Sequence, residues 1–140
     1  MNVTLVAPHP YYFESAMLPG YVAGDYVLED LRIALDGLVE ASGAHFVPAH
    51  VISLDPAGRR VQLSSGDAVP YDVLSVNVEP AVDRDAVEIA MPGARRNALF
   101  TRPLETFVQL WPQLQALARE RALQVAVVGD GVPAVELAMA

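Results

Sequence analysis

The feature that most constrains this chain is an apolar run that leads into a glycine-rich turn near the C-terminus. Residues 124–128 are rich in valine, which is typical of a strand buried on both faces. The turn Gly129-x-Gly131-x-x-Ala134 follows, and residues 135–140 favour a helix. Strand, turn and helix in this order present backbone N–H groups and a helix N-terminus to a pyrophosphate. The pattern therefore predicts a dinucleotide site, although other α/β proteins also use glycine-rich turns between a strand and a helix.

Each small residue of the turn has an expected role. Gly129 permits the tight turn, Gly131 lets the backbone approach the phosphates, and Ala134 allows the helix to lie close to the strand. Glu136, in the predicted helix, is a further candidate cofactor-binding residue. The acidic residue that holds the ribose hydroxyls is expected roughly 20 residues further on, beyond Ala140. We therefore expect an incomplete nucleotide site in this chain.

The composition indicates a folded domain and excludes several classes of function. Hydrophobic residues make up 53% of the 140 residues, which is enough to form a core. Nine Lys and Arg against seventeen Asp and Glu give a formal net charge of -8, which would repel a nucleic-acid backbone. No apolar run reaches the roughly 18 residues of a transmembrane helix, and no signal-peptide pattern is present. We expect a cytoplasmic protein that binds no nucleic acid and has no transmembrane segment.

The sequence contains no pattern of side chains that indicates catalysis or metal binding. It has no cysteine, which excludes disulfides and thiolate zinc sites within the chain. Its three histidines, at positions 9, 45 and 50, are too scattered for a ligand set. Acidic residues near predicted helix starts are typical of solvated faces or of partners of the helix dipole. We therefore predict no catalytic residue and no metal ligand.

The spacing of apolar residues predicts an α/β fold in which a small antiparallel β-meander accompanies a parallel sheet. Strands are expected at residues 3–7, buried on both faces, and at 45–47, 51–54, 59–63, 73–76 and 124–128. One helix is expected near residues 29–42, closed by Gly43.

A second helix is expected from Pro103 to Ala118, with Thr101 as its N-cap and a kink or restart at Pro112. The two remaining segments show little periodicity. Residues 8–25 favour a long, ligand-facing loop with a helical turn at 15–18, and residues 80–102 favour a surface crossing.

Segments spread along most of the chain carry a family resemblance. They are residues 2–8, 17–24, 43–46, 54–55, 60–63, 71–75 and 127–131. In these segments the chain resembles the pyridine nucleotide-disulfide oxidoreductase superfamily. The closest branch is the type II NADH dehydrogenase-like group, and especially the flavoprotein found fused to selenide, water dikinase.

The resemblance implies a Rossmann-like fold that binds FAD and NAD(P)H, with hydride passing from the nicotinamide to the flavin and then to a quinone or another small acceptor. Residues 1–100 would be a truncated FAD-binding domain, and residues 101–140 a helix and the start of the NAD(P)-binding domain. The residues that match the FAD site are Tyr12, Ser15, Met17, Leu18, Pro19 and Val51.

The same resemblance predicts that the chain alone is a fragment and inactive. In the superfamily a first glycine-rich turn precedes the strand that matches residues 3–7, and no such turn precedes it here. Glu79 and Pro80 also depart from the Ala-Thr-Gly that commonly lies beside the flavin. The alternative is a non-catalytic α/β module for binding or oligomerisation. Uncovered sheet edges and apolar faces predict a homo-oligomer in either case.

Overall fold

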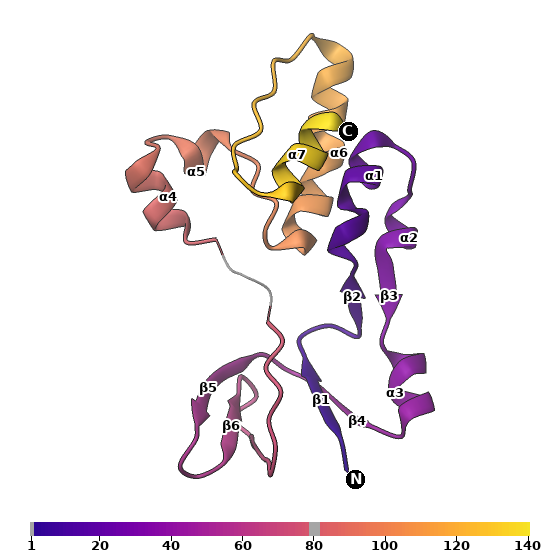
Figure 1. Cartoon of the computed structure of the whole chain (residues 1–140), viewed down its shortest axis with the longest axis vertical. Coiled ribbons are helices and arrows are strands. Elements are labelled where there is room, and N and C mark those ends of the chain that lie inside the picture. The colour runs from indigo at the N-terminus through magenta and orange to yellow at the C-terminus, as the bar shows by residue number, and fades with distance from the viewer. Residues whose placement is uncertain (1, 79–81) are drawn as a thin grey trace. The chain divides into compact units, whose positions relative to one another are not determined.

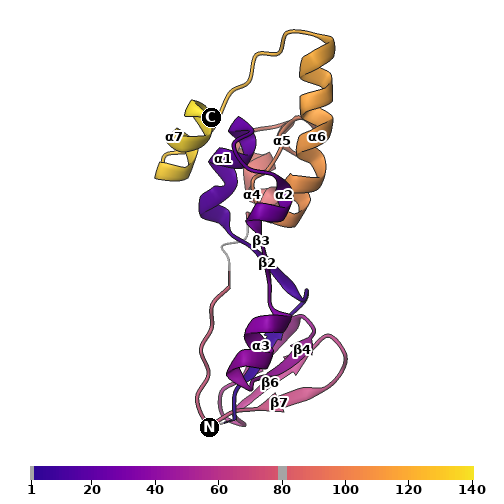
Figure 2. The same cartoon turned by 90° about the vertical axis from the view of Figure 1, so that its right-hand side faces the viewer.

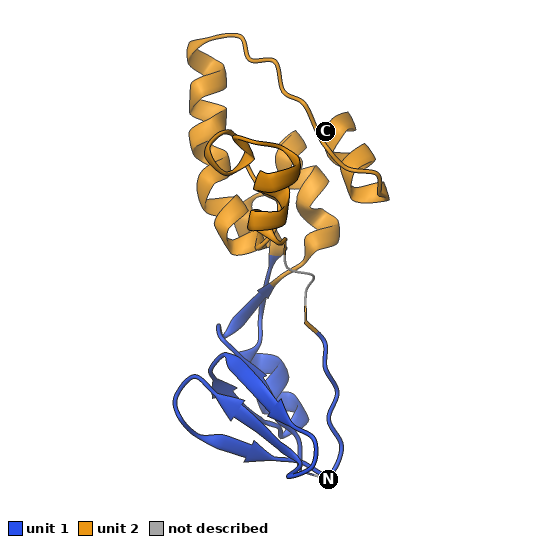
Figure 3. Ribbon diagram, turned by 90° about the vertical axis from the view of Figure 1, so that its left-hand side faces the viewer, with its two compact units in different colours: residues 1–12, 32–77 blue, residues 13–31, 78–140 orange. Residues whose placement is uncertain are grey.

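The computed structural model describes residues 2–78 and 82–140 and divides the chain into two compact units. Unit 1 contains residues 1–12 and 32–77, and unit 2 contains residues 13–31 and 78–140 (Figure 3). Each unit therefore combines two separate stretches of sequence. Compactness does not assign a ligand to either unit, so the division into an FAD-binding part, residues 1–100, and a nicotinamide-binding part, residues 101–140, stays a prediction.

Unit 1 contains a parallel pair of strands, as predicted. β1 (Thr4–Ala7) pairs with β4 (His45–Pro48) in a register that joins Thr4 to His45. Helix α3 (Asp36–Ser42) precedes β4 and ends at Gly43, whose φ of 67° confirms the expected glycine stop. The expectation that residues 3–7 are buried on both faces is wrong, because β1 is exposed or half-buried along its length. Among the described residues β4 alone pairs with it, and a parallel strand is buried only when neighbours and helices cover it.

The predicted antiparallel meander is confirmed in unit 1. β5 (Val51–Asp55) pairs with β6 (Arg60–Leu63), which pairs with β7 (Ala68–Pro70). The Asp55 carboxylate accepts a hydrogen bond of 2.8 Å from the Gly58 N–H and so closes the β5–β6 turn. The buried residues of this unit come from the meander and from the segment before it: Ala49, Val61 and Leu63, with Val6, Val47, Val69 and Tyr71 packed against them.

Unit 2 is mostly helical (Figures 1 and 2). Its elements are the 3-10 helix η1 (Ser15–Met17), α1 (Leu18–Ala23), α2 (Leu28–Leu31), α4 (Arg84–Ala90), α5 (Ala94–Asn97), α6 (Leu104–Glu120) and α7 (Val132–Met139). Its buried side chains are Phe13, Leu18, Leu31, Leu104, Phe107 and Val108. Within the described residues, no helix has both the length and the apolar character that a membrane span requires.

The helix predicted near residues 29–42 is interrupted by a strand. β3 (Arg32–Ala34) pairs with β2 (Tyr11–Phe13) in a two-stranded sheet. Backbone hydrogen bonds from Glu14 to Leu31 (2.8 Å) and from Leu35 to Pro10 (2.9 Å) extend this pairing at both ends. Pairing with a distant segment thus overrides the local helical spacing, and only α2 and α3 remain helical.

Two predicted strands do not form. Residues 73–76 and 124–128 are irregular, and Val73 is 90% exposed, Val125 68% and Val128 75%. Neither segment has a strand partner among the described residues, and an unpaired strand leaves its backbone groups to water. The predictions about Glu79 and Pro80 lie outside the described residues.

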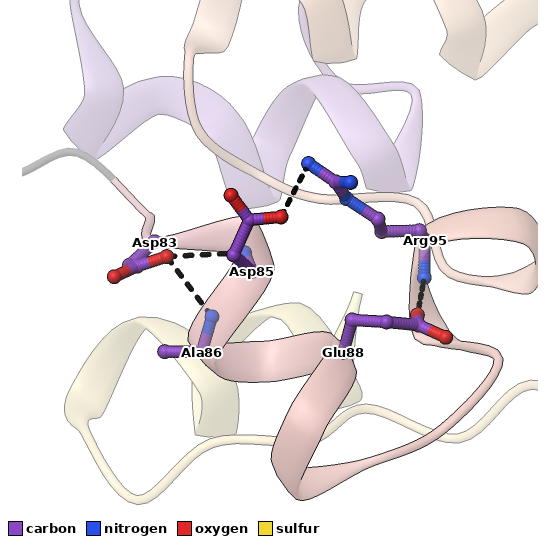
Figure 4. Close-up of polar contacts among 5 residues, drawn as sticks. All are labelled: Asp83, Asp85, Ala86, Glu88 and Arg95. Carbon is purple, nitrogen blue, oxygen red and sulfur yellow. Dashed lines mark hydrogen bonds and ion pairs between the residues drawn. The ribbon is translucent and has the colours of Figure 1, made fainter.

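The predicted surface crossing at residues 80–102 contains α4 and α5. Asp83 is the N-cap of α4, and its carboxylate accepts hydrogen bonds of 3.0 Å from the N–H groups of Asp85 and Ala86 (Figure 4). This cap satisfies two donors that a helix start leaves unpaired, which explains a short helix in a weakly periodic segment.

The predicted helix after residue 101 is α6, but its boundaries differ from the expectation. Its N-cap is Pro103, not Thr101, and the helix runs through Pro112 without a restart. The apolar stripe along this helix outweighs the break expected at Pro112, because Leu104, Phe107 and Val108 are buried along it.

Candidate functional site

The candidate dinucleotide site is the turn into α7. Gly131 is the N-cap of this helix, with φ -99° and ψ 168°. Its carbonyl accepts hydrogen bonds from the N–H groups of Ala134 (3.0 Å) and Val135 (3.4 Å). Within the described residues, the N–H groups of Gly131 and Val132 have no acceptor, so both are available to an anion.

Gly129 and Ala134 lie in close contact at this turn. A Cβ atom on Gly129 would stand 2.8 Å from the Ala134 Cβ, closer than side chains tolerate. A Cβ atom on Gly131 would meet only the Pro133 Cδ, at an ordinary 3.5 Å. Gly129 is therefore required by the packing of the protein itself, whereas the space in front of Gly131 is open and can admit a phosphate.

The charges around the turn oppose a phosphate. Asp130 and Glu136 are both exposed, and residues 122–140 contain no Lys, Arg or His. Pro133, within the first turn of α7, has no N–H to donate. A bound pyrophosphate would thus be held only by backbone N–H groups and the positive end of the helix dipole, against two carboxylates. The geometry fits a dinucleotide phosphate, and the electrostatics predict that binding is weak.

The second candidate segment consists of η1 and α1, where four of the predicted FAD-binding residues lie. The Glu14 carboxylate accepts a hydrogen bond of 3.0 Å from the Ala16 N–H and caps η1. Leu18 is 5% exposed and belongs to the interior of unit 2, whereas Ser15, Met17 and Pro19 are half-buried. The half-buried side chains are the ones of this segment that can contact both the protein and a ligand.

An aromatic contact in the same segment was not predicted from the sequence. A Cβ atom on Gly20 would lie 2.5 Å from the ring of Tyr26, so glycine is needed for this ring to pack on α1. Burial raises the pKa of the Tyr21 hydroxyl above its usual value of 10.0, and the nearby charge of Glu29 raises it further. Tyr21 therefore stays neutral throughout the physiological pH range.

The predicted site residues are divided between the two units. Tyr12, 40% exposed in β2, and Val51, 52% exposed in β5, belong to unit 1. The other candidates belong to unit 2, where α1 and α7 are in contact (Figures 1 and 2). The structure thus brings the element that carries Leu18 and Pro19 together with the element that carries Ala134 and Glu136.

A cluster of polar contacts between α4 and α5 was also missed (Figure 4). The Glu88 carboxylate accepts 2.8 Å hydrogen bonds from the N–H groups of Gly93 and Arg95. The Arg95 guanidinium forms an ion pair of 2.8 Å with Asp85. The two backbone hydrogen bonds lower the pKa of the Glu88 carboxyl below its usual value of 4.5, and the Arg95 charge adds to the effect. All these groups bond to one another, so the cluster stabilises the turn between the two helices.

A stack of three side chains in unit 1 was missed as well. The rings of His9 and Tyr11 are parallel to within 11°, with their centroids 5.3 Å apart. The Arg32 guanidinium lies 4.3 Å from the centroid of the Tyr11 ring. The stack joins the start of β2 to β3 and helps to hold the β2–β3 pair together.

No family model matches the chain, but comparison with known proteins gives several relatives, all of them named as dehydrogenases, oxidoreductases or reductases. A NADH dehydrogenase-like protein of Mycobacterium tuberculosis is 32% identical over 115 residues, which cover 79% of this chain. The external NADH-ubiquinone oxidoreductase 2 of Saccharomyces cerevisiae mitochondria is 24% identical over 98% of the chain. The sulfide-quinone reductase of Aquifex aeolicus is 26% identical over 57% of it. The chain spans 28% of the length of the first two relatives and 19% of the length of the third.

Solved structures show the same type of fold. The match with the sulfide:quinone oxidoreductase of A. aeolicus covers 84% of this chain and 26% of the oxidoreductase chain, with a TM-score of 0.62 and 23% identity. The match with NDH2 of Plasmodium falciparum, solved in complex with NADH, covers 89% of this chain and 26% of the NDH2 chain, with a TM-score of 0.68 and 13% identity. The match with NADH:rubredoxin oxidoreductase of Clostridium acetobutylicum covers 98% of this chain and 34% of the oxidoreductase chain, with a TM-score of 0.64 and 17% identity.

These comparisons confirm the predicted α/β fold of the FAD/NAD(P)-binding oxidoreductase type. The relatives and the structural neighbours are NADH dehydrogenase-like, sulfide-quinone and NADH:rubredoxin oxidoreductases. They are consistent with the predicted resemblance to the pyridine nucleotide-disulfide oxidoreductase superfamily.

Proposed function

We propose that this chain is part of an FAD-dependent NAD(P)H oxidoreductase that passes hydride from the nicotinamide to the flavin and from there to a quinone or another small acceptor. The observation that carries the proposal is the close contact of Gly129 with Ala134 at the N-terminus of α7, beside an open approach to Gly131. The names of the relatives, which include NADH and quinone oxidoreductases, support the same chemistry.

In this proposal the turn before α7 holds the pyrophosphate of NAD(P)H. The N–H groups of Gly131 and Val132 donate hydrogen bonds to it, and Gly129 lets the turn approach Ala134. FAD, when bound, would supply the hydride-accepting ring, and Tyr12, Ser15, Met17, Leu18, Pro19 and Val51 are the residues that we assign to its site. Residues 1–100 then correspond to the FAD-binding part and residues 101–140 to the start of the nicotinamide-binding part.

The proposal includes two finer statements. The chain alone binds FAD weakly or not at all and is inactive. The nearest branch is the one that includes the flavoprotein fused to selenide, water dikinase. The cytoplasmic location and the homo-oligomeric state also remain predictions.

A titration of the purified chain with NADH tests the phosphate site. We expect weak binding that is strengthened roughly fivefold by Asp130→Asn, since one exposed charge a few ångströms from a phosphate is worth about 1 kcal/mol. Asp72→Asn is the matched control, because Asp72 is an exposed aspartate of unit 1. No NADH binding to either variant or to the original chain would contradict the nucleotide assignment.

The alternative is a non-catalytic α/β module for binding or oligomerisation. The irregular, exposed state of residues 124–128 favours it, because a working nucleotide-binding turn normally follows a paired strand. A flavin absorbance scan after incubation with FAD and removal of unbound cofactor, combined with the NADH titration, separates the two functions. The module binds neither cofactor. The oxidoreductase segment binds NADH weakly through α7, whether or not it retains FAD.

A further inference from the structure

The helix that carries the candidate phosphate site is too short to be stable by itself. α7 contains eight residues, and isolated helices shorter than roughly 12 to 15 residues are marginal in water. Within the described part of the chain, residues 122–130, which precede α7, neither donate nor accept a backbone hydrogen bond. The helical form of α7 must therefore come from packing against another element of unit 2.

The element that packs against α7 is α1. Both views of the chain show the two helices side by side, and α1 is the element of unit 2 with which α7 has its most extensive contact (Figures 1 and 2). The side chains of α7 are exposed except for Ala134 and Leu137, which are half-buried. These two residues are three positions apart and therefore share one face of the helix. This face is the one that α7 turns toward the protein.

Ala134 and Leu137 have different neighbours on this face. Ala134 lies against Gly129, because a Cβ atom on that glycine would stand 2.8 Å from the Ala134 Cβ. Leu137 lies one helical turn further along and is the one large side chain of α7 that is partly removed from water. It is therefore the apolar side chain of α7 that is available to pack on α1, in which residues 18–22 are buried or half-buried.

We infer that Leu137 is a positioning residue of the nucleotide turn, because it holds α7 in its helical form against α1. The N–H groups of Gly131 and Val132 and the positive end of the helix dipole form a phosphate site only while the residues after them are helical. When α7 leaves α1, this site is lost. The apparent affinity for NAD(P)H, which rests on the proposed function, then falls with the fraction of molecules in which α7 is docked.

The contact also links the two cofactor sites of the proposed oxidoreductase. α1 carries Leu18 and Pro19, which we assign to the FAD site, and α7 follows the turn that we assign to NAD(P)H. By linkage, a ligand that binds only when α7 is docked must stabilise the contact with α1. NADH should therefore slow amide hydrogen exchange in α1 as well as in α7, although it binds at the turn.

Substitutions at Leu137 test the contact without any nucleotide. Leu137→Gln keeps the helix propensity nearly unchanged but places an amide against α1, so amide hydrogen exchange at residues 136–140 should become about tenfold faster. Met139→Gln is the matched control, because it makes a similar change at an 83% exposed position of the same helix and should leave exchange unchanged. Leu137→Met conserves volume and apolarity and should keep most of the protection. Equal exchange rates in Leu137→Gln and Met139→Gln would overturn the inference.

An NADH titration of the same variants tests the positioning of the turn. Leu137→Gln should weaken NADH binding by up to about tenfold, whereas Met139→Gln and Leu137→Met should bind like the natural chain. Faster exchange in Leu137→Gln with an unchanged NADH affinity would overturn the positioning role. A natural chain that binds no NADH would contradict the proposed function, and the exchange rates alone would then decide whether Leu137 holds α7 on α1. Urea unfolding followed by the fluorescence of Trp111, in α6, checks that the rest of unit 2 is folded in every variant.

Discussion

The carboxylate of Glu88, near the end of α4, accepts a 2.8 Å hydrogen bond from the backbone N–H of Arg95 in the first turn of α5. Its other oxygen binds the N–H of Gly93, the N-cap of α5, at the same distance. One side chain thus satisfies two donors that the start of a helix leaves unpaired. The side chain of Arg95 returns to Asp85 in the first turn of α4, so the two short helices are tied together in both directions.

Replacing Glu88 with glutamine should lower the melting temperature at pH 7, because an amide has one acceptor oxygen where the carboxylate uses two. The folded pKa of Glu88 lies below its usual value of 4.5, so its contribution is fully present above that value. The contribution is lost as the pH falls through the lowered pKa. Thermal unfolding followed by circular dichroism should therefore show a gap between the natural chain and Glu88→Gln at pH 7 that closes in acid.

Glu120 provides the control for this experiment. It is an exposed glutamate at the end of α6, and its side chain has no hydrogen bond among the described contacts. Glu120→Gln should leave the melting temperature at pH 7 nearly unchanged. A gap for Glu88→Gln that persists with the same size below pH 3 would show that the carboxylate charge is not its cause.

The N-cap of α4 allows a second prediction. Asp83→Ala removes the acceptor of both 3.0 Å hydrogen bonds and should destabilise unit 2 by about 1 kcal/mol. Asp83→Asn keeps an oxygen acceptor and should retain most of the stability. Urea unfolding of the two variants measures the difference, and equal losses for alanine and asparagine would mean that the cap geometry is not what stabilises the helix.

The elements that the sequence predicted well are those whose partners are nearby in the chain. The β5–β6 pair and the glycine stop at Gly43 depend on turns of a few residues, whereas the third strand of the meander, β7, lies at residues 68–70 and not at the expected 73–76. The helix α6 follows from one apolar stripe, whose members Leu104, Phe107 and Val108 are buried. In each case the information that decides the structure lies within a short window, which is the range that periodicity and turn chemistry cover.

The elements that were predicted wrongly depend on distant partners. The strand β3 replaces part of a helix because it pairs with β2, about 20 residues earlier, and no local pattern contains that pairing. Residues 124–128 have the composition of a buried strand, yet composition does not provide the neighbouring strands that would pair with them. The same distinction applies to the site. The close contact of Gly129 and Ala134 agrees with the motif spacing, whereas Glu88 meets Gly93 and Arg95 across a turn that the sequence did not reveal.

A pair of leucines on α6 tests where the core of unit 2 lies. Leu104 is 1% exposed and Leu110 is 40% exposed in the same helix. Leu104→Ala should cost about 2 to 5 kcal/mol, as is typical of a fully buried leucine, and Leu110→Ala should cost less than about 1.5 kcal/mol. The single tryptophan, Trp111, stacks on Phe107 with 5.7 Å between ring centroids, so its fluorescence reports the unfolding of this unit. Similar losses for the two variants would contradict the burial pattern of α6.

The contact between Gly129 and Ala134 makes the sharpest prediction about the nucleotide turn. Gly129→Ala places a Cβ atom 2.8 Å from that of Ala134, so the turn must open or α7 must shift, at a cost of about 1 to 3 kcal/mol. Because Ala134→Gly removes the opposing atom, the double variant Gly129→Ala/Ala134→Gly should regain the packing, less roughly 1 kcal/mol for a glycine within a helix. The shift of the Gly131 and Val132 amide resonances on adding NADH should be lost in the single variant and return in the double one.

Gly37→Ala is the matched control for this last experiment. Gly37 lies in α3, and a Cβ atom there would meet no atom within 4 Å. Alanine is the better helix former, so this variant should be stabilised by up to about 1 kcal/mol and should leave the response to NADH unchanged. If the double variant behaved like Gly129→Ala alone, the steric contact would not be the reason for glycine at this position. The turn would then need glycine for its backbone conformation or for a ligand that approaches it.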